Sequence, residues 1–312
     1  MLFSLLESEG NAVNAQKTNQ GVMEALARQK FGRAQKLFFE NARKNPSYQT
    51  FNNLGYYLIT EGLECKNGKV RNAYRLGFSY LLKSRASHPS FTNSCAIAFA
   101  LSHFAEGAVQ GESHGEEDLY AAVLDALSLG YSDTMQYNLL RLQFGMKREG
   151  EDFLSQVREL ASRFPCEESA SLYLEAARTL GRIEEGMRCL RVYGDLIDAP
   201  TRLLFLASVK EYEAGYSLSQ EVAQWCLRSV DIASIVECCL QTDRQNRIGE
   251  LLSKDRLAPA REDAEHSRLV DQLLDPYHTE ARRSMMKQHR EIPPFLSPCC
   301  FFGCPSHQTD WE

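Results

Sequence analysis

The stretch GRAQKLFFENARKNPS, residues 32–47, decides the fold of this chain. Its apolar and small residues, counted from the phenylalanine just before it, include Phe31, Ala34, Leu37, Phe38 and Ala42. They fall three or four positions apart with Lys and Arg between them, which places them on one face of a helix. Pro46 then marks the end of the helix, because proline has no backbone N–H and clashes with the preceding turn. The stretch therefore predicts an amphipathic helix with a proline stop.

The same pattern returns twice, in YRLGFSYLLKSRASHPS (74–90) and in EDFLSQVRELASRFPCE (151–167). In each copy a small or apolar residue is followed by a large apolar residue four positions later, another side chain three later and a proline five later. The matching sets are Ala34, Phe38, Asn41 and Pro46; Gly77, Leu81, Ser84 and Pro89; and Phe153, Val157, Leu160 and Pro165. A second helical pattern lies next to each copy. The sequence therefore predicts stacked helix pairs at a spacing of roughly forty residues.

These helix pairs resemble the tetratricopeptide repeat family, which carries a Leu-Gly-Tyr motif in the first helix and an Ala-Phe-Ala-Pro motif in the second. NLGYYL (53–58) followed by GFSYLLKSRASHPS (77–90) is the best matching module, with about ten extra residues between its helices. The resemblance covers residues 20–200. It implies an all-α fold, a right-handed α-solenoid of stacked antiparallel helix pairs.

The expected organisation has four parts. Residues 1–19 form an N-terminal helix, 20–200 the tetratricopeptide-like repeats, 201–291 further helix pairs with a C-terminal cap, and 292–312 an extended tail. In the third part the consensus is lost, but helical periodicity continues. There Thr201 is a possible helix start and Gly215 a possible helix stop.

The composition is that of an ordered, folded protein, with 44% hydrophobic and 24% charged residues. No window approaches the run of about 18 apolar residues that a membrane helix needs. The first residues, MLFSLLESEGN, lack the basic start of a signal peptide. We therefore expect a cytoplasmic protein without a membrane partner.

The charges are unevenly distributed. Residues 1–85 contain 13 Lys or Arg against 6 acidic residues, whereas residues 86–200 contain 9 against 18. This polarity suits a charged partner or self-association of the chain. The basic insertion KNGKVRNAYR suggests an edge for an acidic partner, with the candidate residues Lys66, Lys69, Arg71 and Arg75. The alternative is an elaborated turn with a solvated helix start, and the net charge of −6 argues against nucleic acid.

Catalytic signatures are missing from the sequence. It has no HExxH metalloprotease motif, no phosphate-binding loop, no dinucleotide fingerprint and no GxSxG elbow. We therefore expect a non-catalytic scaffold or adaptor that binds a protein or peptide, with no resident cofactor. A regulatory subunit of an enzyme encoded elsewhere fits the same sequence.

The family resemblance also implies a peptide-binding groove lined by the first helix of each pair, in which asparagines bond an extended peptide backbone. Asn52 and Asn138 lie two residues before Leu54 and Leu140 and so occupy corresponding positions. Tyr56 and Leu142 follow one turn later on the same face. The candidate peptide-binding residues are thus Asn52, Tyr56, Asn138 and Leu142. The alternative is that the asparagines cap or bridge neighbouring helices, and Cys95 at the corresponding place in the intervening module breaks the pattern.

The tail, EIPPFLSPCCFFGCPSHQTDWE (291–312), contains four prolines and cannot continue a helix. Three interpretations remain open. Cys299, Cys300, Cys304 and His307 have the number and type of ligands for zinc, although adjacent cysteines seldom both reach one ion. Exposed thiols can instead be modified. In the third interpretation the tail docks into an apolar groove of the chain itself or of a partner, through Phe295, Phe301, Phe302 and Trp311.

Overall fold

The computed structural model describes residues 2–64, 70–105, 114–224, 227–258, 260 and 264–304; the side chains of 2–13, 61–64, 70–72 and 104–105 also lie outside the description. Within these ranges the chain forms α-helices and short 3-10 helices and contains no strand. The all-α class expected from the sequence is therefore confirmed. No helix in these ranges has the length and apolar character that crossing a membrane requires.

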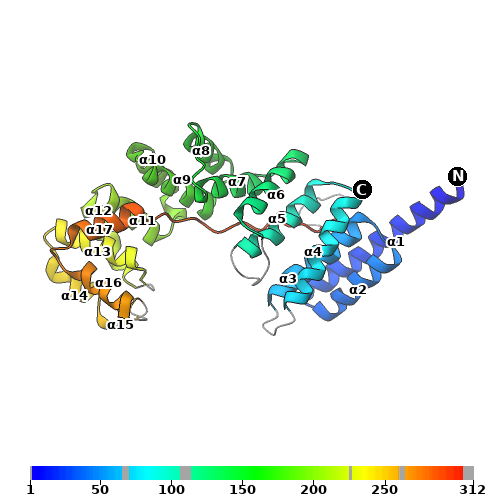
Figure 1. Cartoon of the computed structure of the whole chain (residues 1–312), viewed down its shortest axis with the longest axis horizontal. Coiled ribbons are helices and arrows are strands. Elements are labelled where there is room, and N and C mark those ends of the chain that lie inside the picture. The colour runs from blue at the N-terminus through cyan, green and yellow to red at the C-terminus, as the bar shows by residue number, and fades with distance from the viewer. Residues whose placement is uncertain are drawn as a thin grey trace. The chain divides into compact units, whose positions relative to one another are not determined.

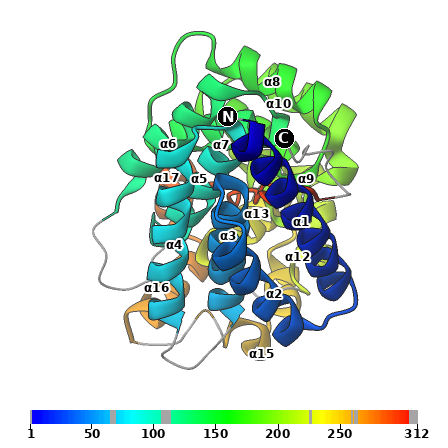
Figure 2. The same cartoon turned by 90° about the vertical axis from the view of Figure 1, so that its right-hand side faces the viewer.

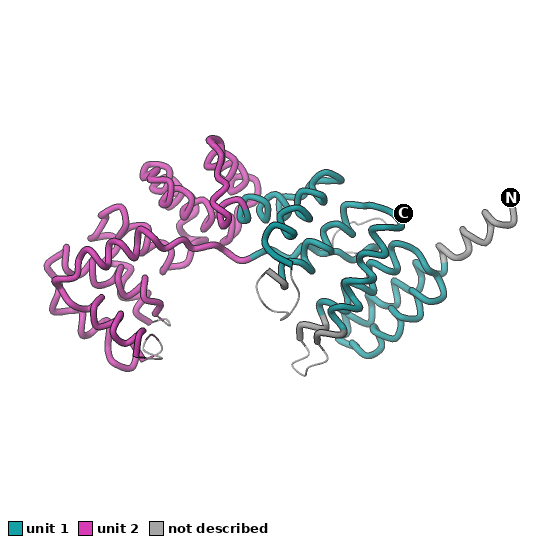
Figure 3. Tube along the Cα trace, in the orientation of Figure 1, with its two compact units in different colours: residues 1–142, 295–312 teal, residues 143–294 magenta. Residues whose placement is uncertain are grey.

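The chain divides into two compact units (Figure 3), one made of residues 1–142 with 295–312 and the other of residues 143–294. The first unit contains α1 (Leu2–Ala27), α2 (Phe31–Lys44), α3 (Tyr48–Glu64), α4 (Val70–Ser87), α5 (Phe91–Ala105), α6 (Glu116–Leu129) and most of α7 (Asp133–Gly145). From α1 to α6 each helix packs against the next one in the chain where both are described, as Figures 1 and 2 show for α1 to α4. The four-part organisation expected from the sequence is a different division and stays a prediction.

The second unit is also built from consecutive helices that pack on one another. They are α8 (Phe153–Arg163), α9 (Glu167–Thr179), α10 (Ile183–Tyr193), η1 (Gly194–Leu196), α11 (Ala199–Ser208), α12 (Tyr212–Val222), α13 (Ser229–Gln241), η2 (Gln245–Arg247), α14 (Ile248–Leu251), α15 (Lys254–Leu257), α16 (Ala264–Leu274) and α17 (Thr279–Gln288). Its core gathers around α13, whose residues Val230 to Cys239 are all buried. A segment without helix follows α17 (Figure 1).

The three proline patterns all end a helix and start the next one in the same way. Ser47 and Thr50 exchange hydrogen bonds between backbone and side chain at the start of α3, and Thr50 also donates to the carbonyl of Asn45, at 2.9 Å. Ser90 and Asn93 do the same before α5. Such reciprocal bonds satisfy N–H groups that the first helical turn leaves unpaired. The shared chemistry supports a repeated structural unit.

The bond across the proline recurs as well. Asn93 donates to the carbonyl of His88 at 2.7 Å, and Ser169 donates to that of Phe164 at 2.5 Å. In each of the three copies the acceptor is the carbonyl of the residue just before the proline. The side chain therefore ties the end of one helix to the start of the next, which fixes the turn between them.

Two features of α11 and α12 differ from the sequence expectation. Asp198, rather than Thr201, caps α11, because its carboxylate accepts the backbone N–H of Thr201 at 2.8 Å. Gly215 does not stop a helix but lies inside α12, buried against the sulfur of Cys238. A glycine required for close packing looks in sequence like one that ends a helix.

Candidate functional site

Residues 295–304 belong to the first unit and contain no helix or strand. We call them the docked segment. Side chains of α1, α3 and α7 form hydrogen bonds with the backbone of the docked segment. The carbonyl oxygens bound in this way belong to every second residue, namely Leu296, Pro298, Cys300 and Phe302. A period of two is typical of an extended chain, in which alternate residues face the same side.

Two asparagine amides each bind both backbone groups of one residue. Asn138 of α7 donates to the carbonyl of Leu296 at 2.8 Å and accepts the N–H of Leu296 at 2.9 Å. Asn53 of α3 donates to the carbonyl of Phe302 at 3.0 Å and accepts the N–H of Phe302 at 2.8 Å. A side-chain amide has one acceptor and two donor hydrogens, so it can replace the partner strand of an extended peptide. These contacts recognise backbone rather than side chain.

Three further side chains complete the site. Asn52 donates to the carbonyl of Cys300 at 2.6 Å, and Tyr56 donates to that of Pro298 at 3.0 Å. Asn19 of α1 donates to the carbonyl of Phe302 at 3.0 Å and accepts a hydrogen from Asn53 at 2.8 Å. Burial raises the pKa of Tyr56 far above its usual value, so the phenol stays protonated and able to donate. We call Asn19, Asn52, Asn53, Tyr56 and Asn138 the binding face.

The side chains of the docked segment are partly buried by aromatic rings. Phe301 stacks on Phe38 with ring centroids 5.7 Å apart and meets Tyr56 edge-on at 4.8 Å. Phe302 is buried and meets the ring of Tyr48 edge-on at 5.4 Å. Edge-on and offset ring pairs add about 0.5–1.5 kcal/mol each beyond the area that they bury. The binding face thus holds the backbone, and the rings hold the side chains.

The structure places the sequence-predicted site residues unequally. Asn52, Tyr56 and Asn138 all contact the docked segment, whereas Leu142 is buried in α7. Lys66, Lys69 and the side chain of Arg71 lie outside the described residues, and Arg75 is exposed on α4. Of the expected docking residues, Phe301 and Phe302 have the contacts given above, Phe295 is half-buried, and Trp311 lies outside the described residues.

Two residues of the binding face, Asn19 and Asn53, were not expected from the sequence. Asn53 directly follows Asn52, and a search for adjacent amides near the repeat motif would have found it. Asn19 lies in α1, outside the repeat pattern, and only its place in the folded unit brings it to Phe302. No sequence signal marks it.

The thiols of the docked segment lie in a protected environment. Cys300 is fully buried, and this burial raises its pKa well above the usual value, with the neighbouring thiols of Cys95 and Cys299 adding to the effect. Burial likewise raises the pKa of Cys299 to about 11 and that of Cys95 to about 12. At neutral pH these thiols are therefore protonated and unreactive as nucleophiles. Within the described residues no three His, Cys, Asp or Glu side chains converge on one point, and His307 lies outside them.

The buried thiol gives a direct measure of docking. In the native chain, we expect Cys300 to react with a maleimide far more slowly than the half-buried Cys304, because the reagent needs an exposed thiolate. Asn53→Ala and Asn138→Ala each remove two hydrogen bonds to the docked segment, about 1–3 kcal/mol, and should raise the Cys300 rate by about fivefold to a hundredfold. Mass spectrometry of the labelled chain measures these rates.

The control for this experiment is Asn14→Ala, an exposed asparagine of α1 outside the binding face. It should leave the Cys300 rate unchanged. Equal labelling of Cys300 and Cys304 in the unmodified chain would show that the segment is not held in place.

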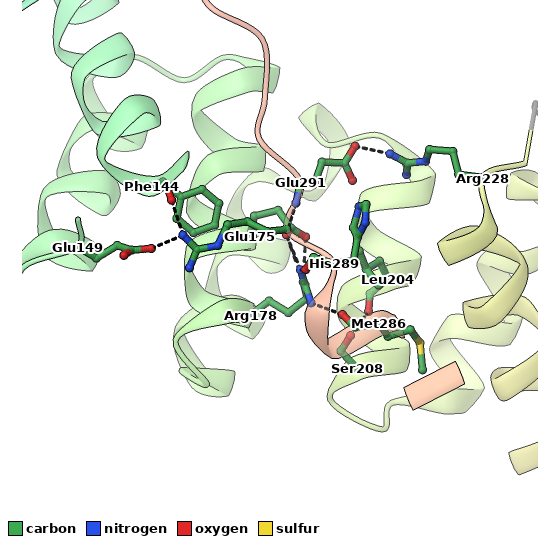
Figure 4. A network of polar contacts seen from close by, with 11 residues as sticks. Phe144, Glu149, Glu175, Arg178, Leu204, Ser208, Arg228, Met286, His289 and Glu291 are labelled. Atoms are coloured by element: carbon green, nitrogen blue, oxygen red, sulfur yellow. Dashed lines mark hydrogen bonds and ion pairs between the residues drawn. The ribbon is translucent and has the colours of Figure 1, made fainter. Parts of the chain in front are cut away.

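Ion pairs and hydrogen bonds within the second unit hold residues 286–291, which precede the docked segment (Figure 4). Arg178 of α9 is bound to the carboxylate of Glu175 at 2.7 Å, and it donates to the carbonyls of Met286 at 2.7 Å and His289 at 2.5 Å. Both charged side chains are almost fully buried, at 3% and 0% exposure. The Glu175 carboxylate also accepts the N–H of Glu291, at 3.4 Å. One buried ion pair thus holds the end of α17 and the turn after it.

Two more ion pairs extend this network. The guanidinium of Arg290 is bound to Glu149 at 2.6 Å, donates to the carbonyl of Phe144 and lies 4.2 Å from the centre of the Phe144 ring. Arg228 reaches Glu291 at 2.6 Å. Charged and polar contacts at Met286, His289, Arg290 and Glu291 therefore position this part of the chain before it continues to Phe295.

Comparison of the chain with models of protein families gave no match, and comparison with curated proteins gave no relative.

Proposed function

We propose that the chain is a non-catalytic, tetratricopeptide-like helical-repeat module that binds an extended peptide segment of a partner protein on the binding face. The observation that carries this proposal is the paired hydrogen bonding of Asn53 and Asn138, each of which binds the N–H and the carbonyl of a single residue. A helical ligand has no such free backbone groups. Only an extended peptide can present them.

The docked segment acts as an intramolecular occupant of this face. Because it is covalently attached, its effective concentration is high, on the order of millimolar for a short flexible connection. A partner peptide must displace it, so full-length chain should bind added peptide more weakly than a chain without the segment. The docked segment thereby determines how tightly a partner peptide must bind in order to displace it.

The fit of the segment is incomplete at one position. Asn52 is fully buried, and its side-chain oxygen has no hydrogen-bond partner among the described residues. A buried acceptor without a donor costs about 1–3 kcal/mol. A partner peptide that offers a donor at this point would gain that energy relative to the docked segment. This difference supports a face that exchanges occupants.

The test uses chain that ends at Ile292 and a fluorescent peptide with the sequence of residues 293–304. We expect the shortened chain to bind the peptide, and the full chain to bind it at least about tenfold more weakly. In the shortened chain, Asn53→Ala should weaken binding by about fivefold to a hundredfold, because two hydrogen bonds are lost. Fluorescence anisotropy measures each Kd.

Asn14→Ala again serves as the matched control and should bind like the parent. Binding that Asn53→Ala and Asn138→Ala leave unchanged would contradict the role of the binding face. Equal binding by full and shortened chain would contradict competition from the docked segment while leaving the face itself intact.

A further inference from the structure

A cavity of about 720 Å³ opens between α2, α3 and α4. It is separate from the binding face, whose residues do not line it. Three aromatic rings border it. Phe51 and Tyr80 stack with ring centroids 6.0 Å apart, and Phe39 is 37% exposed at the opening. An exposed ring beside two stacked rings offers a flat apolar surface to another aromatic side chain.

Three cations lie around the same cavity. Lys36 and Arg43 project from α2, seven residues and thus two turns apart, and Lys83 projects from α4. The ammonium of Lys83 lies 4.0 Å from the centre of the Phe51 ring, which keeps the charge at the aromatic wall. Cations and rings therefore share one site.

None of these three cations forms an ion pair within 4 Å with a carboxylate in the described part of the chain. The cavity contains one acidic residue, Glu40, and it forms an ion pair with Lys44. The pKa of Glu40 lies below its usual value, mainly because of Lys44 and further because of Lys36 and Arg43. The cavity thus carries a surplus of positive charge.

A second cavity, between α8, α9 and α10, shows the contrast. Its Arg158 and Arg188 both pair with Glu185, at 3.3 and 3.2 Å, and its Arg163 pairs with Glu159 at 3.2 Å. There each of the three cations forms an ion pair with a carboxylate of the chain. In the α2–α4 cavity they remain available to a ligand.

We propose that the α2–α4 cavity binds an acidic peptide segment of a partner protein that carries an aromatic side chain. The ligand's ring lies against Phe39 and Tyr80, and its carboxylates lie near Lys36, Arg43 and Lys83. Charge complementarity selects this ligand class, because three unpaired cations and an aromatic wall together match carboxylates that flank a ring. The proposal does not rest on the binding face.

Single-stranded nucleic acid also combines stacking with negative charge, but it needs a long positive groove that follows its backbone. Three cations at one cavity are few for that purpose, and residues 86–200 are strongly acidic. A short peptide fits the observed distribution of charge better.

The experiment measures binding of a fluorescent synthetic peptide, with one tryptophan flanked by glutamates, to the full-length chain. We expect saturable binding that weakens as salt is added and disappears when glutamines replace the glutamates. The double variant Lys36→Glu with Arg43→Glu should bind about tenfold more weakly, because two attractions become repulsions. Phe39→Ala should also weaken binding.

The controls change the same charges and ring type at the start of α2, outside the cavity; Lys30 directly precedes the helix. Lys30→Glu with Arg33→Glu matches the charge reversal, and Phe31→Ala matches the loss of an exposed ring. Both should bind the peptide like the parent, within about twofold.

Equal loss of affinity in both charge-reversal pairs would overturn the proposal, because it would show only attraction to a basic surface. An unchanged affinity in Phe39→Ala would overturn the proposal that the ligand's ring lies against Phe39. Tighter binding of a single-stranded oligonucleotide than of the peptide would replace the peptide by nucleic acid as the ligand. Asn53→Ala should leave this binding unchanged, so failure here and failure of the proposed function are separate results.

Discussion

Arg178→Met should lower the free energy of unfolding of the second unit by about 3–5 kcal/mol. The substitution keeps most of the volume but leaves Glu175 as a fully buried carboxylate without its cation. It also removes the donors to the carbonyls of Met286 and His289. Because the chain has two compact units, native-state hydrogen exchange at the amides of α9 is the appropriate measurement.

A double-mutant cycle separates the ion pair from the other contacts. Glu175→Met alone should also destabilise the unit, because it strands the guanidinium. The double variant with Arg178→Met should lose much less than the sum of the two, since no buried charge then lacks a partner. The exposed pair between Arg188 and Glu185 provides the control, and Arg188→Met should cost less than about 1 kcal/mol. Additive losses in the cycle would disprove the coupling.

The Arg178→Met variant also tests how the docked segment is held. Arg178 fixes the carbonyls of the residues from which the segment departs, within the second unit. If this fixation pre-organises the segment, Arg178→Met should raise the labelling rate of Cys300 although it touches no residue of the binding face. The ion-pair network then affects docking through the residues that connect it to the docked segment, and not through the binding face.

Local structure could be predicted well from the sequence. The spacing of Phe31, Ala34, Leu37, Phe38 and Ala42 predicted a helix face, on which Ala34, Phe38 and Ala42 are buried, Leu37 is half-buried and Phe31, in the first turn, is exposed; Pro46 predicted the end of the helix. The signals for these features lie within one or two turns of each other, where helix geometry relates spacing to face. The capping side chains Thr50 and Asn93 follow the prolines at a fixed interval and belong to the same local class.

The partners of the binding face could only partly be predicted. The repeat register singled out Asn52 and Asn138, because equivalent positions in repeats face the same side. That Cys300 and Leu296 would be their partners was not readable, since these contacts join residues 248 and 158 positions apart. Such pairings depend on where the chain returns, which no local pattern encodes. The contact of Asn19 with Phe302 could not be predicted for the same reason, because only the folded unit brings the two residues together.

Gly55→Ala should destabilise the first unit by about 3 kcal/mol, at the upper end of the usual cost of overpacking. A Cβ atom at Gly55 would lie 2.7 Å from the carbonyl oxygen of Gly77, and a Cβ at Gly77 would lie 2.8 Å from that of Gly55. Both obstacles are backbone atoms, so no rotamer change can relieve them, and α3 and α4 must move apart.

The control is the same substitution at another helical glycine. Gly32 of α2 has no atom within 4 Å of its Cβ position, so Gly32→Ala should stabilise the unit by a few tenths to about 1 kcal/mol. Hydrogen exchange at the amides of α3 and α4 measures both variants. A neutral Gly55→Ala would mean that the two helices can separate at little cost.

Gly55 also lies within the sequence that forms the binding face, between Asn53 and Tyr56 on α3. A shift of α3 away from α4 moves both donors relative to α7, which carries Asn138. Hydrogen bonds weaken steeply when distance or angle departs from its optimum. Gly55→Ala should therefore increase the labelling rate of Cys300 as well as lower stability, whereas Gly32→Ala should change neither in that direction. A destabilised unit with Cys300 still protected would show that the face tolerates movement of its supporting helix.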